Sequence, residues 1–152
     1  MSSTGQDLAT LVDRCEQRGV AVTAQRRAVL ENLCTRADHP TADEVHLAVA
    51  REVDGVSRAT VYRTLETLVE RGLMVRVLHP SASTRYDLKV HRHHHLVCDG
   101  CGAVADLDDP VLDALPIAIP VETKDPAGFQ MLDYSVSVRG LCAPCAATRS
   151  DA

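Results

Sequence analysis

Two cysteine pairs of identical spacing constrain the C-terminal half of this 152-residue chain more than any other feature. The pairs are Cys98-x-x-Cys101 and Cys142-x-x-Cys145, separated by forty residues. A spacing of two residues lets both sulfurs of a pair reach one ion, and two pairs complete the tetrahedral four-thiolate shell that Zn²⁺ prefers in structural sites. Redox-active pairs and buried free thiols are the alternatives, but a redox motif needs only one pair. The spacing therefore predicts a structural zinc site that stabilises the C-terminal region.

The composition is that of a folded globular chain, with 45% hydrophobic and 24% charged residues. Aromatic residues are scarce, with three Tyr, one Phe and no Trp, so a small subdomain needs support from a metal or a partner chain. The chain begins with polar and charged residues where a signal peptide has an apolar segment, and nowhere do about 18 apolar residues run together. We therefore expect a cytoplasmic protein with no membrane partner, whose six cysteines are metal ligands or buried thiols rather than disulfides.

Charge divides the chain into two electrostatically different halves. Residues 1–89 contain twelve Arg or Lys and twelve Asp or Glu, whereas residues 90–152 contain four and nine. The net charge of −5 therefore belongs entirely to the second half. An acidic chain argues against a nucleic-acid partner, since phosphate binding uses a basic surface, but the neutral first half leaves such a partner open.

Four helices are predicted in the first half from apolar residues at helical spacing and from capping residues. The residues that cap or end these helices are Gly19, Thr23, Thr41 with Glu44, Ser57 and Gly72. Thr41-x-x-Glu44 has the form of a capping box, and Asp54-Gly55 is a turn between the third helix and the fourth. Two helices joined by a short turn containing Gly form the pattern of a helix-turn-helix.

A β-hairpin is predicted directly after the fourth helix. Leu73, Val75 and Val77 alternate with polar positions, residues 79–83 form a turn, and residues 85–88 return as a second strand. Such a hairpin after a helix-turn-helix is a wing. We place the first domain at residues 1–84, with a hinge at about residues 80–84, and the second domain at residues 85–152. In the second domain, alternation from Tyr134 predicts a strand that ends at Gly140, after an apolar stretch at residues 111–121.

The fourth helix carries polar side chains outside its apolar stripe. These are Arg58, Thr60, Tyr62, Arg63 and Thr67. Arg donates to phosphate or guanine, Thr and Tyr reach phosphates or a thymine methyl, and the helix N-terminus favours an anion. A single helix with such a face is usually only solvated, but the preceding helix, turn and wing favour double-stranded DNA as the partner.

A histidine cluster stands three residues before the first cysteine pair, and its sequence is His91-Arg92-His93-His94-His95. Alternate side chains of an extended segment share a face, so His91, His93 and His95 are expected to project together and His94 away from them. With Asp87 and Asp106 as nearby oxygen donors, the cluster predicts a second, open metal site. A solvated histidine run is the alternative, and the loop residue His39 is ambiguous when taken alone.

Together these segments resemble the ferric uptake regulator (Fur) family of metal-dependent DNA-binding repressors. The matching segments are residues 22–26, 39–44, 57–65, 85–86 and 93–98 and the closing Cys142-x-x-Cys145. The resemblance implies an α+β fold, in which a winged helix-turn-helix domain precedes a small α/β dimerisation domain with a four-cysteine zinc site. It also implies a homodimer that binds palindromic operator DNA.

The resemblance assigns roles to particular residues. The structural zinc ligands correspond to Cys98, Cys101, Cys142 and Cys145. A regulatory metal site that straddles the two domains corresponds to His39, Asp87, His93, His95 and Asp106, with His91 as a further candidate. The DNA-binding candidates are Arg58, Thr60, Tyr62, Arg63 and Gln25. An ion held by both domains fixes the angle between the DNA-binding heads and so the spacing of the recognition helices on the operator.

Asp rather than Glu at positions 87 and 106 resembles the peroxide-sensing branch of the family, which includes PerR, CatR and FurA regulators of catalase genes. In that branch Fe²⁺ reacts with hydrogen peroxide and a ligand histidine gains oxygen, and His39 and His93 hold the corresponding positions. This implies Fe²⁺ or Mn²⁺ as the regulatory metal. An iron-uptake repressor, or a nickel-responsive repressor that binds Ni²⁺ with the help of His91, are the alternatives within the family.

Some features depart from the family pattern. Arg92 and Tyr134 stand where many members have ligands of a third metal site, so we expect that site to be absent. Ala21 replaces a basic residue that enters the minor groove, and Arg18 is the candidate substitute.

Two other classes of protein fit the sequence less well. A zinc enzyme needs an open metal position and a general base, whereas the four-cysteine set is closed and no His-Glu-x-x-His is present, so we expect no enzyme activity. A zinc-containing module that binds only protein leaves the helix-turn-helix and the His/Asp set without a role.

Overall fold

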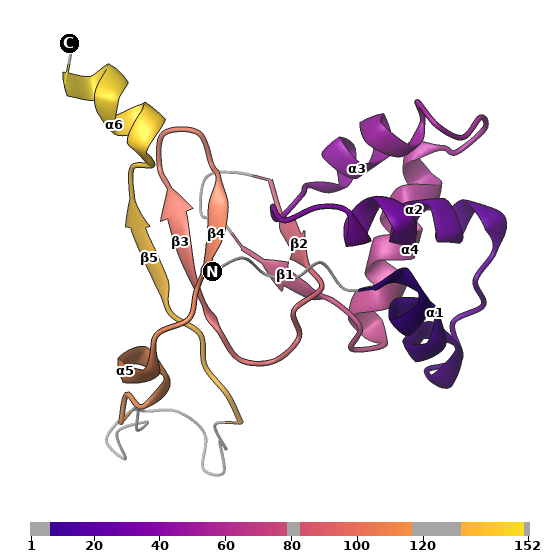
Figure 1. Cartoon of the computed structure of the whole chain (residues 1–152), viewed down its shortest axis with the longest axis horizontal. Helices are drawn as coiled ribbons and strands as arrows, with labels where there is room; N and C mark the ends of the chain where they lie inside the picture. The colour runs from indigo at the N-terminus through magenta and orange to yellow at the C-terminus, as the bar shows by residue number, and fades with distance from the viewer. Residues whose placement is uncertain (1–6, 79–82, 117–131, 151–152) are drawn as a thin grey trace, which may run out of the picture. The chain divides into compact units, whose positions relative to one another are not determined.

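The computed structural model describes residues 7–78, 83–116 and 132–150, and the chain divides into two compact units, residues 1–90 and 91–152 (Figure 1). The division lies later than the boundary expected after residue 84, because the strand at residues 85–87 pairs within the first unit. Residues 80–82 of the expected hinge lie outside the described residues. In the described ranges no helix has the length and apolar character needed to cross a membrane.

The helices of the first unit are α1 (Leu8–Gln17), α2 (Ala24–Cys34), α3 (Ala42–Val49) and α4 (Arg58–Glu70). The predicted caps are confirmed: the side chains of Thr23 and Ser57 accept main-chain N–H groups, and Thr41 and Glu44 form both halves of a capping box. Gly72 adopts a φ of 64°, in the left-handed region that side chains other than glycine rarely adopt. The chain therefore leaves α4 where the sequence predicts.

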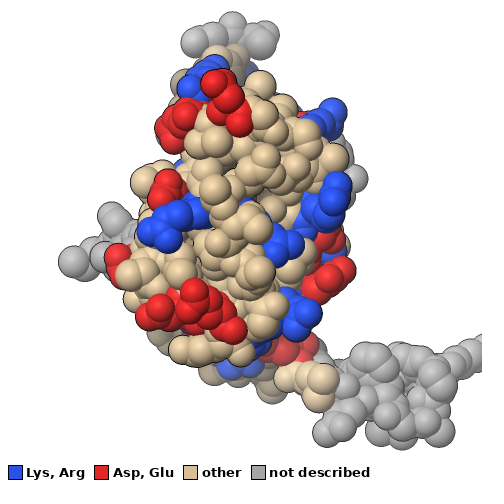
Figure 2. Space-filling model, turned by 90° about the vertical axis from the view of Figure 1, so that its right-hand side faces the viewer, with Lys and Arg blue, Asp and Glu red and all other residues tan. Residues whose placement is uncertain are grey.

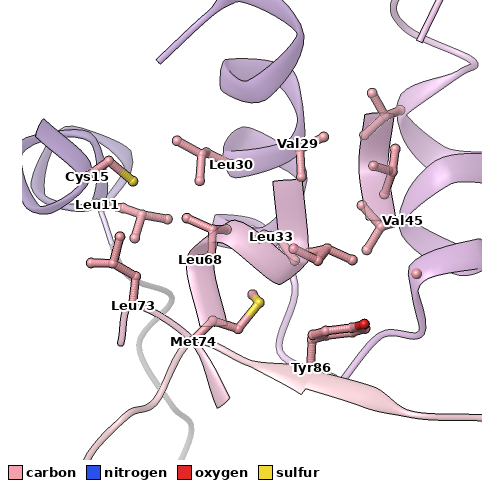
Figure 3. Close-up of a cluster of buried hydrophobic side chains, with 14 of the residues drawn as sticks. Leu11, Cys15, Val29, Leu30, Leu33, Val45, Leu68, Leu73, Met74 and Tyr86 are labelled. Carbon is pink, nitrogen blue, oxygen red and sulfur yellow. The ribbon is translucent and has the colours of Figure 1, made fainter. Parts of the chain in front are cut away.

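The core of the first unit is almost entirely aliphatic (Figure 3). Its labelled side chains are Leu11, Cys15, Val29, Leu30, Leu33, Val45, Leu68, Leu73, Met74 and Tyr86. Burying one such Leu or Val side chain stabilises the fold by roughly 1.5–3 kcal/mol. Because all four helices contribute to this core, the orientation of α4 and its polar face is fixed by packing rather than by helix propensity.

Strands β1 (Val75–Val77) and β2 (Arg85–Asp87) form the predicted antiparallel hairpin, with Arg76 opposite Tyr86. The predicted turn at residues 79–83 falls largely outside the described residues. The hairpin is tied to α4, because the Glu66 carboxylate accepts hydrogen bonds from the Tyr86 hydroxyl at 2.9 Å and from the Arg76 guanidinium. The wing is thus fastened to the helix that carries the polar face.

The second unit contains the strands β3 (His94–Cys98), β4 (Val104–Leu107) and β5 (Ser137–Gly140) and the helices α5 (Pro110–Asp113) and α6 (Ala143–Ser150). The strand order is β4-β3-β5, with β4 antiparallel and β5 parallel to β3. The strand expected from Tyr134 begins only at Ser137, because pairing with β3 starts where Ser137 lies opposite His95. Of the apolar stretch at residues 111–121, residues 117–121 lie outside the described residues.

Candidate metal sites and nucleic-acid interface

The four cysteines of the two C-x-x-C pairs come together at one end of the β3–β5 pair. Cys98 ends β3 opposite Gly140 of β5, and Cys142 and Cys145 lie at the start of α6. The four sulfurs lie within 4.8 Å of one another, and the Cys101 and Cys142 sulfurs are 3.8 Å apart. Parallel pairing of strands that are distant in the sequence therefore explains how a forty-residue gap still permits one site.

The cysteines of this site differ in how readily they lose a proton. The main-chain N–H of Cys142 donates to the Cys98 sulfur at 3.3 Å, and with the N–H groups of Cys101 and Gly100 it lowers the pKa of Cys98 to about 6. Hydrogen bonds with the sulfurs of Cys142, Cys101 and Cys98 raise the pKa of Cys145 to about 12, so this cysteine retains its proton when no cation is bound. Four soft sulfur donors within tetrahedral reach fit structural Zn²⁺.

Gly100 is a residue of this site that the sequence reasoning did not single out. A Cβ atom at this position would lie 2.9 Å from both Cβ and Sγ of Cys145. Only glycine lets the turn from Cys98 to Cys101 approach α6 this closely. A glycine between paired cysteines is the signal from which this role could have been predicted.

The N-terminal unit contains a buried histidine–carboxylate pair. Nε2 of His39 lies 3.2 Å from Oδ2 of Asp87, and the two side chains are 5% and 11% exposed. Asp87 ends β2, and its Oδ1 accepts the main-chain N–H of Lys89 at 2.8 Å. The loop histidine that was ambiguous from sequence alone is therefore buried against a carboxylate.

The C-terminal unit contains a second group of the same chemistry. Nε2 of His93 lies 3.4 Å from Oδ1 of Asp106, and the rings of His93 and His95 meet edge to face at 4.5 Å. Nδ1 of His93 lies 2.8 Å from the carbonyl oxygen of His91, which can only accept, so Nδ1 donates a hydrogen bond there. Nε2, the other ring nitrogen, faces the Asp106 carboxylate.

The histidine run only partly follows the predicted alternation. His93 and His95 share a face as expected, but His91 is exposed and precedes β3, with its ring 6.0 Å from that of His93. The expectation of three aligned histidines therefore holds for the buried His93 and His95 and not for the exposed His91.

His94 is fully buried and joins the sheet to α5. Its Nδ1 accepts the main-chain N–H of Val136 at 3.0 Å, and its Nε2 lies 3.2 Å from Oδ1 of Asp113. The Tyr134 hydroxyl donates to the carbonyl oxygens at the end of α5, and the Arg92 guanidinium stacks 5.0 Å from the centre of the Tyr134 ring. Arg92 and Tyr134 therefore belong to the network of contacts around His94.

The donor types of the two His/Asp groups fit a regulatory divalent metal. His39 and Asp87 come from the first unit, and His93, His95 and Asp106 come from the second. Imidazole nitrogen suits iron, zinc and nickel, and carboxylate oxygen suits manganese as well. Neither group contains a cysteine, in contrast to the four-cysteine site.

The DNA-binding candidates lie where α4 begins and along its exposed side. Tyr62 and Arg63 are exposed, whereas Arg58 forms a two-point ion pair with Asp43 of α3 and its guanidinium lies 5.6 Å from the Tyr62 ring centre. Gln25 of α2 donates to the carbonyl oxygen of Gly55 at 3.4 Å. On the face shown in Figure 2, positive and negative side chains are interspersed rather than gathered into one basic patch.

A winged helix-turn-helix unit, a four-cysteine cluster and a His/Asp set define the class of metal-responsive regulators. Within that class, the chain belongs to the ferric uptake regulator family, whose family model matches residues 17–138. This is a family of transcriptional regulators that act as DNA-binding dimers, and the resemblance inferred from the sequence is confirmed.

Relatives from several branches of the family are similar to this chain. The peroxide-responsive repressor PerR of Staphylococcus aureus (strain USA300) is 28% identical over 145 residues, which is 95% of each chain. The Campylobacter jejuni peroxide stress regulator is 32% identical, with a TM-score of 0.61 over 91% of this chain and 98% of the other. A zinc-bound manganese uptake regulator is 28% identical, with a TM-score of 0.69 over 88% of this chain and 98% of the other.

Proposed function

We propose that this protein is a metal-dependent repressor that binds palindromic operator DNA as a homodimer in the cytoplasm and releases it on exposure to hydrogen peroxide. The observation that carries the proposal is the pairing of buried histidines with aspartates in both units, His39 with Asp87 and His93 with Asp106. Similarity to the Staphylococcus and Campylobacter peroxide regulators supports the same function.

Five side chains carry the metal response in this proposal. The regulatory ion, Fe²⁺ or Mn²⁺, would supply positive charge and, as Fe²⁺, would promote cleavage of the peroxide O–O bond, while the oxidised histidine ring supplies the electrons. His39 and Asp87 bind from the first unit, and His93, His95 and Asp106 bind from the second. Ligands drawn from both units restrict the relative orientation of the units, which in a two-fold dimer sets the spacing of the recognition helices.

The response to peroxide is a covalent change at His39 or His93. One peroxide oxygen forms a bond to the ring carbon between the two nitrogens, the C–H bond at that carbon breaks and a hydrogen ends on ring nitrogen, and the other peroxide oxygen leaves as water. The ring is oxidised by two electrons as the peroxide is reduced. Both nitrogens of the oxidised ring then carry hydrogen, so the ring no longer presents a lone pair to a cation. Loss of one ligand weakens metal binding, the heads lose their fixed spacing, and the operator is released.

The DNA contacts come from α4 and its surroundings in this proposal. Arg58, Thr60, Tyr62 and Arg63 face the major groove, and Gln25 contacts the backbone beside it. Because positive and negative charges balance over residues 1–89, few phosphate contacts are available to one head. Two correctly spaced heads are therefore needed for tight binding, which makes affinity sensitive to the regulatory metal.

Peptide mass spectrometry tests the proposal directly. Protein loaded with Fe²⁺ without oxygen receives one equivalent of hydrogen peroxide, and protein loaded with Mn²⁺ is the matched control because Mn²⁺ does not drive the oxidation. We expect one added oxygen on His39 or His93 in the iron form, with parallel loss of operator binding, and no change in the manganese form. Unmodified histidines with DNA still bound would refute peroxide sensing.

Regulation of metal uptake without a peroxide response is the second candidate function. The specific observation in its favour is the similarity to the manganese uptake regulator. Unmodified histidines together with operator binding that follows the iron or manganese concentration would establish it. The nickel-responsive alternative depends on His91, which is exposed and so loses its main support.

A further inference from the structure

Arg85 connects the loop that contains His39 to the start of α3. Its Nη1 atom donates to the main-chain carbonyl oxygen of His39 at 2.7 Å and lies 3.2 Å from Oε2 of Glu44. The Arg85 side chain is only 14% exposed. A largely buried guanidinium that bonds a carbonyl and a carboxylate together fixes the distance between them.

The main chain around Arg85 strengthens this connection. The N–H of Tyr86 donates to the carbonyl oxygen of Pro40 at 3.0 Å, and Thr41 forms an antiparallel bridge with Arg85. The segment that follows His39 therefore lies along the edge of β2. Asp87 stands two residues beyond Arg85 on the same strand, so both residues project from the same face.

Glu44 carries the connection into the helix-turn-helix. Its Oε2 atom accepts the main-chain N–H of Thr41 at 2.8 Å, and Thr41 in turn caps the N–H of Glu44 at 3.2 Å. Arg85 thus contacts the capping box that begins α3, the helix that packs on α4. A displacement of the loop that contains His39 would therefore reach α3 through the Arg85 side chain and the Glu44 carboxylate.

We propose that Arg85 is a positioning residue that couples the regulatory metal site to the DNA-reading helices. This inference rests on the proposed function. Arg85 holds the main chain of His39 so that the imidazole stays beside Asp87, and the same guanidinium holds the first turn of α3. Ordering of His39 and Asp87 by a metal therefore also orders the start of α3.

Arg76 offers a matched control within the same hairpin. It too pairs with a glutamate, Glu66, but it contacts neither His39 nor Asp87 in the described structure. Replacing Arg76 removes an arginine–glutamate pair that joins the two-stranded sheet to α4 and leaves the His39 loop in place. Arg85→Met and Arg76→Met therefore separate a general loss of hairpin stability from a specific loss at the metal ligands.

The test uses the full-length, zinc-containing protein and Mn²⁺ alone as the probe, followed by electron paramagnetic resonance of free Mn²⁺. We expect Arg85→Met to weaken Mn²⁺ binding about tenfold, as loss of a residue that orients a ligand typically does, and Arg76→Met to leave it unchanged. Arg85→Lys keeps one cationic donor and should restore part of the affinity. It also serves as the second variant where Arg85→Met does not fold.

Amide hydrogen exchange gives a readout that a merely structural role would not produce. Mn²⁺ should slow exchange in the first turn of α3, residues 42–45, in the wild type and in Arg76→Met but not in Arg85→Met. Wild-type Mn²⁺ affinity and wild-type protection in Arg85→Met would overturn the role of Arg85 while leaving the proposed function intact. A wild-type protein that binds no Mn²⁺ beyond its zinc would overturn both.

Discussion

Arg18 and Arg71 each donate a guanidinium hydrogen bond to the other's main-chain carbonyl oxygen, at 2.7 and 3.1 Å. They are the C-cap residues of α1 and α4. Each cation therefore satisfies a carbonyl at the negative end of the opposite helix. These two reciprocal hydrogen bonds hold the end of α1 to the end of α4, the proposed recognition helix. They also give Arg18 a structural partner in addition to any contact with DNA.

Replacement of Arg71 by Ala should lower the free energy of unfolding by about 1 kcal/mol, because an exposed charge-assisted hydrogen bond and the cation at the α1 terminus are both lost. Urea denaturation followed by far-ultraviolet circular dichroism measures the change. Arg27→Ala is the control, since the exposed pair of Arg27 with Glu31 one turn away contributes about 0.3–0.5 kcal/mol. Equal losses in both variants would contradict a special role for the reciprocal pair.

Replacement of Gly100 by Ala should weaken zinc binding, because the new methyl group would lie 2.9 Å from Cys145 and push α6 away from the cysteine turn. The rate of zinc release to a chelator measures the effect. Gly140→Ala is the matched control, since no atom lies within 4 Å of a Cβ at that position in the described structure. A release rate in Gly100→Ala equal to that of the control would show that the close approach is unimportant.

The number of protons released on zinc binding should depend on pH. Backbone N–H groups hold the pKa of Cys98 at about 6, so above that pH Cys98 is already a thiolate and contributes no proton when zinc binds. Below it, Cys98 is protonated and the number released rises by one. Titration calorimetry in buffers of different ionisation enthalpy counts these protons. An equal number of released protons above and below this pH would contradict the lowered pKa of Cys98.

The two proposed metal sites should respond differently to mutation. Cys142→Ser removes a zinc ligand, so we expect loss of zinc and unfolding of the C-terminal unit. His39→Ala removes a proposed regulatory ligand, so we expect normal zinc content, a normal circular dichroism spectrum and no metal-dependent operator binding. Elemental analysis and gel-shift titration make the comparison. Retained metal dependence in His39→Ala would disprove this division of roles.

Replacement of Arg63 by Ala should weaken operator binding by about 1–3 kcal/mol without changing metal content, because Arg63 is exposed on α4 and is proposed to contact DNA. Fluorescence anisotropy with labelled operator measures the loss. Arg27→Ala, an equally simple removal of an exposed positive charge, should leave affinity nearly unchanged. Equal affinities in the two variants would mean that another face of the unit binds DNA.

Features set by neighbouring residues could be predicted from the sequence. Thr23, Thr41 and Ser57 cap the helices they were expected to cap, because a cap depends on a side chain and an N–H group three residues away. The four-cysteine cluster was predictable from spacing alone, since few other arrangements use two such pairs.

Features set by long-range pairing could not be predicted in the same way. The first strand of the C-terminal unit begins at His94 and not at His91, because its pairing with β4 starts where Leu107 lies opposite His94. Arg85 was recognised within a motif, but its contacts with His39 and Glu44 span more than forty residues of sequence. No periodicity in the sequence encodes such a contact, so the side chains that position the proposed ligands emerge only from the structure.

The parallel pairing of β3 with β5 makes the four-cysteine cluster a cross-link between distant parts of the chain. With zinc bound, the segment from Cys98 to Cys145 is a closed loop, and closing it reduces the conformational entropy of the unfolded chain as a disulfide does. Unlike a disulfide, this closure withstands thiol reductants and yields to chelators. The persistence of the C-terminal unit is therefore tied to the supply of one ion and not to the reducing power of its surroundings.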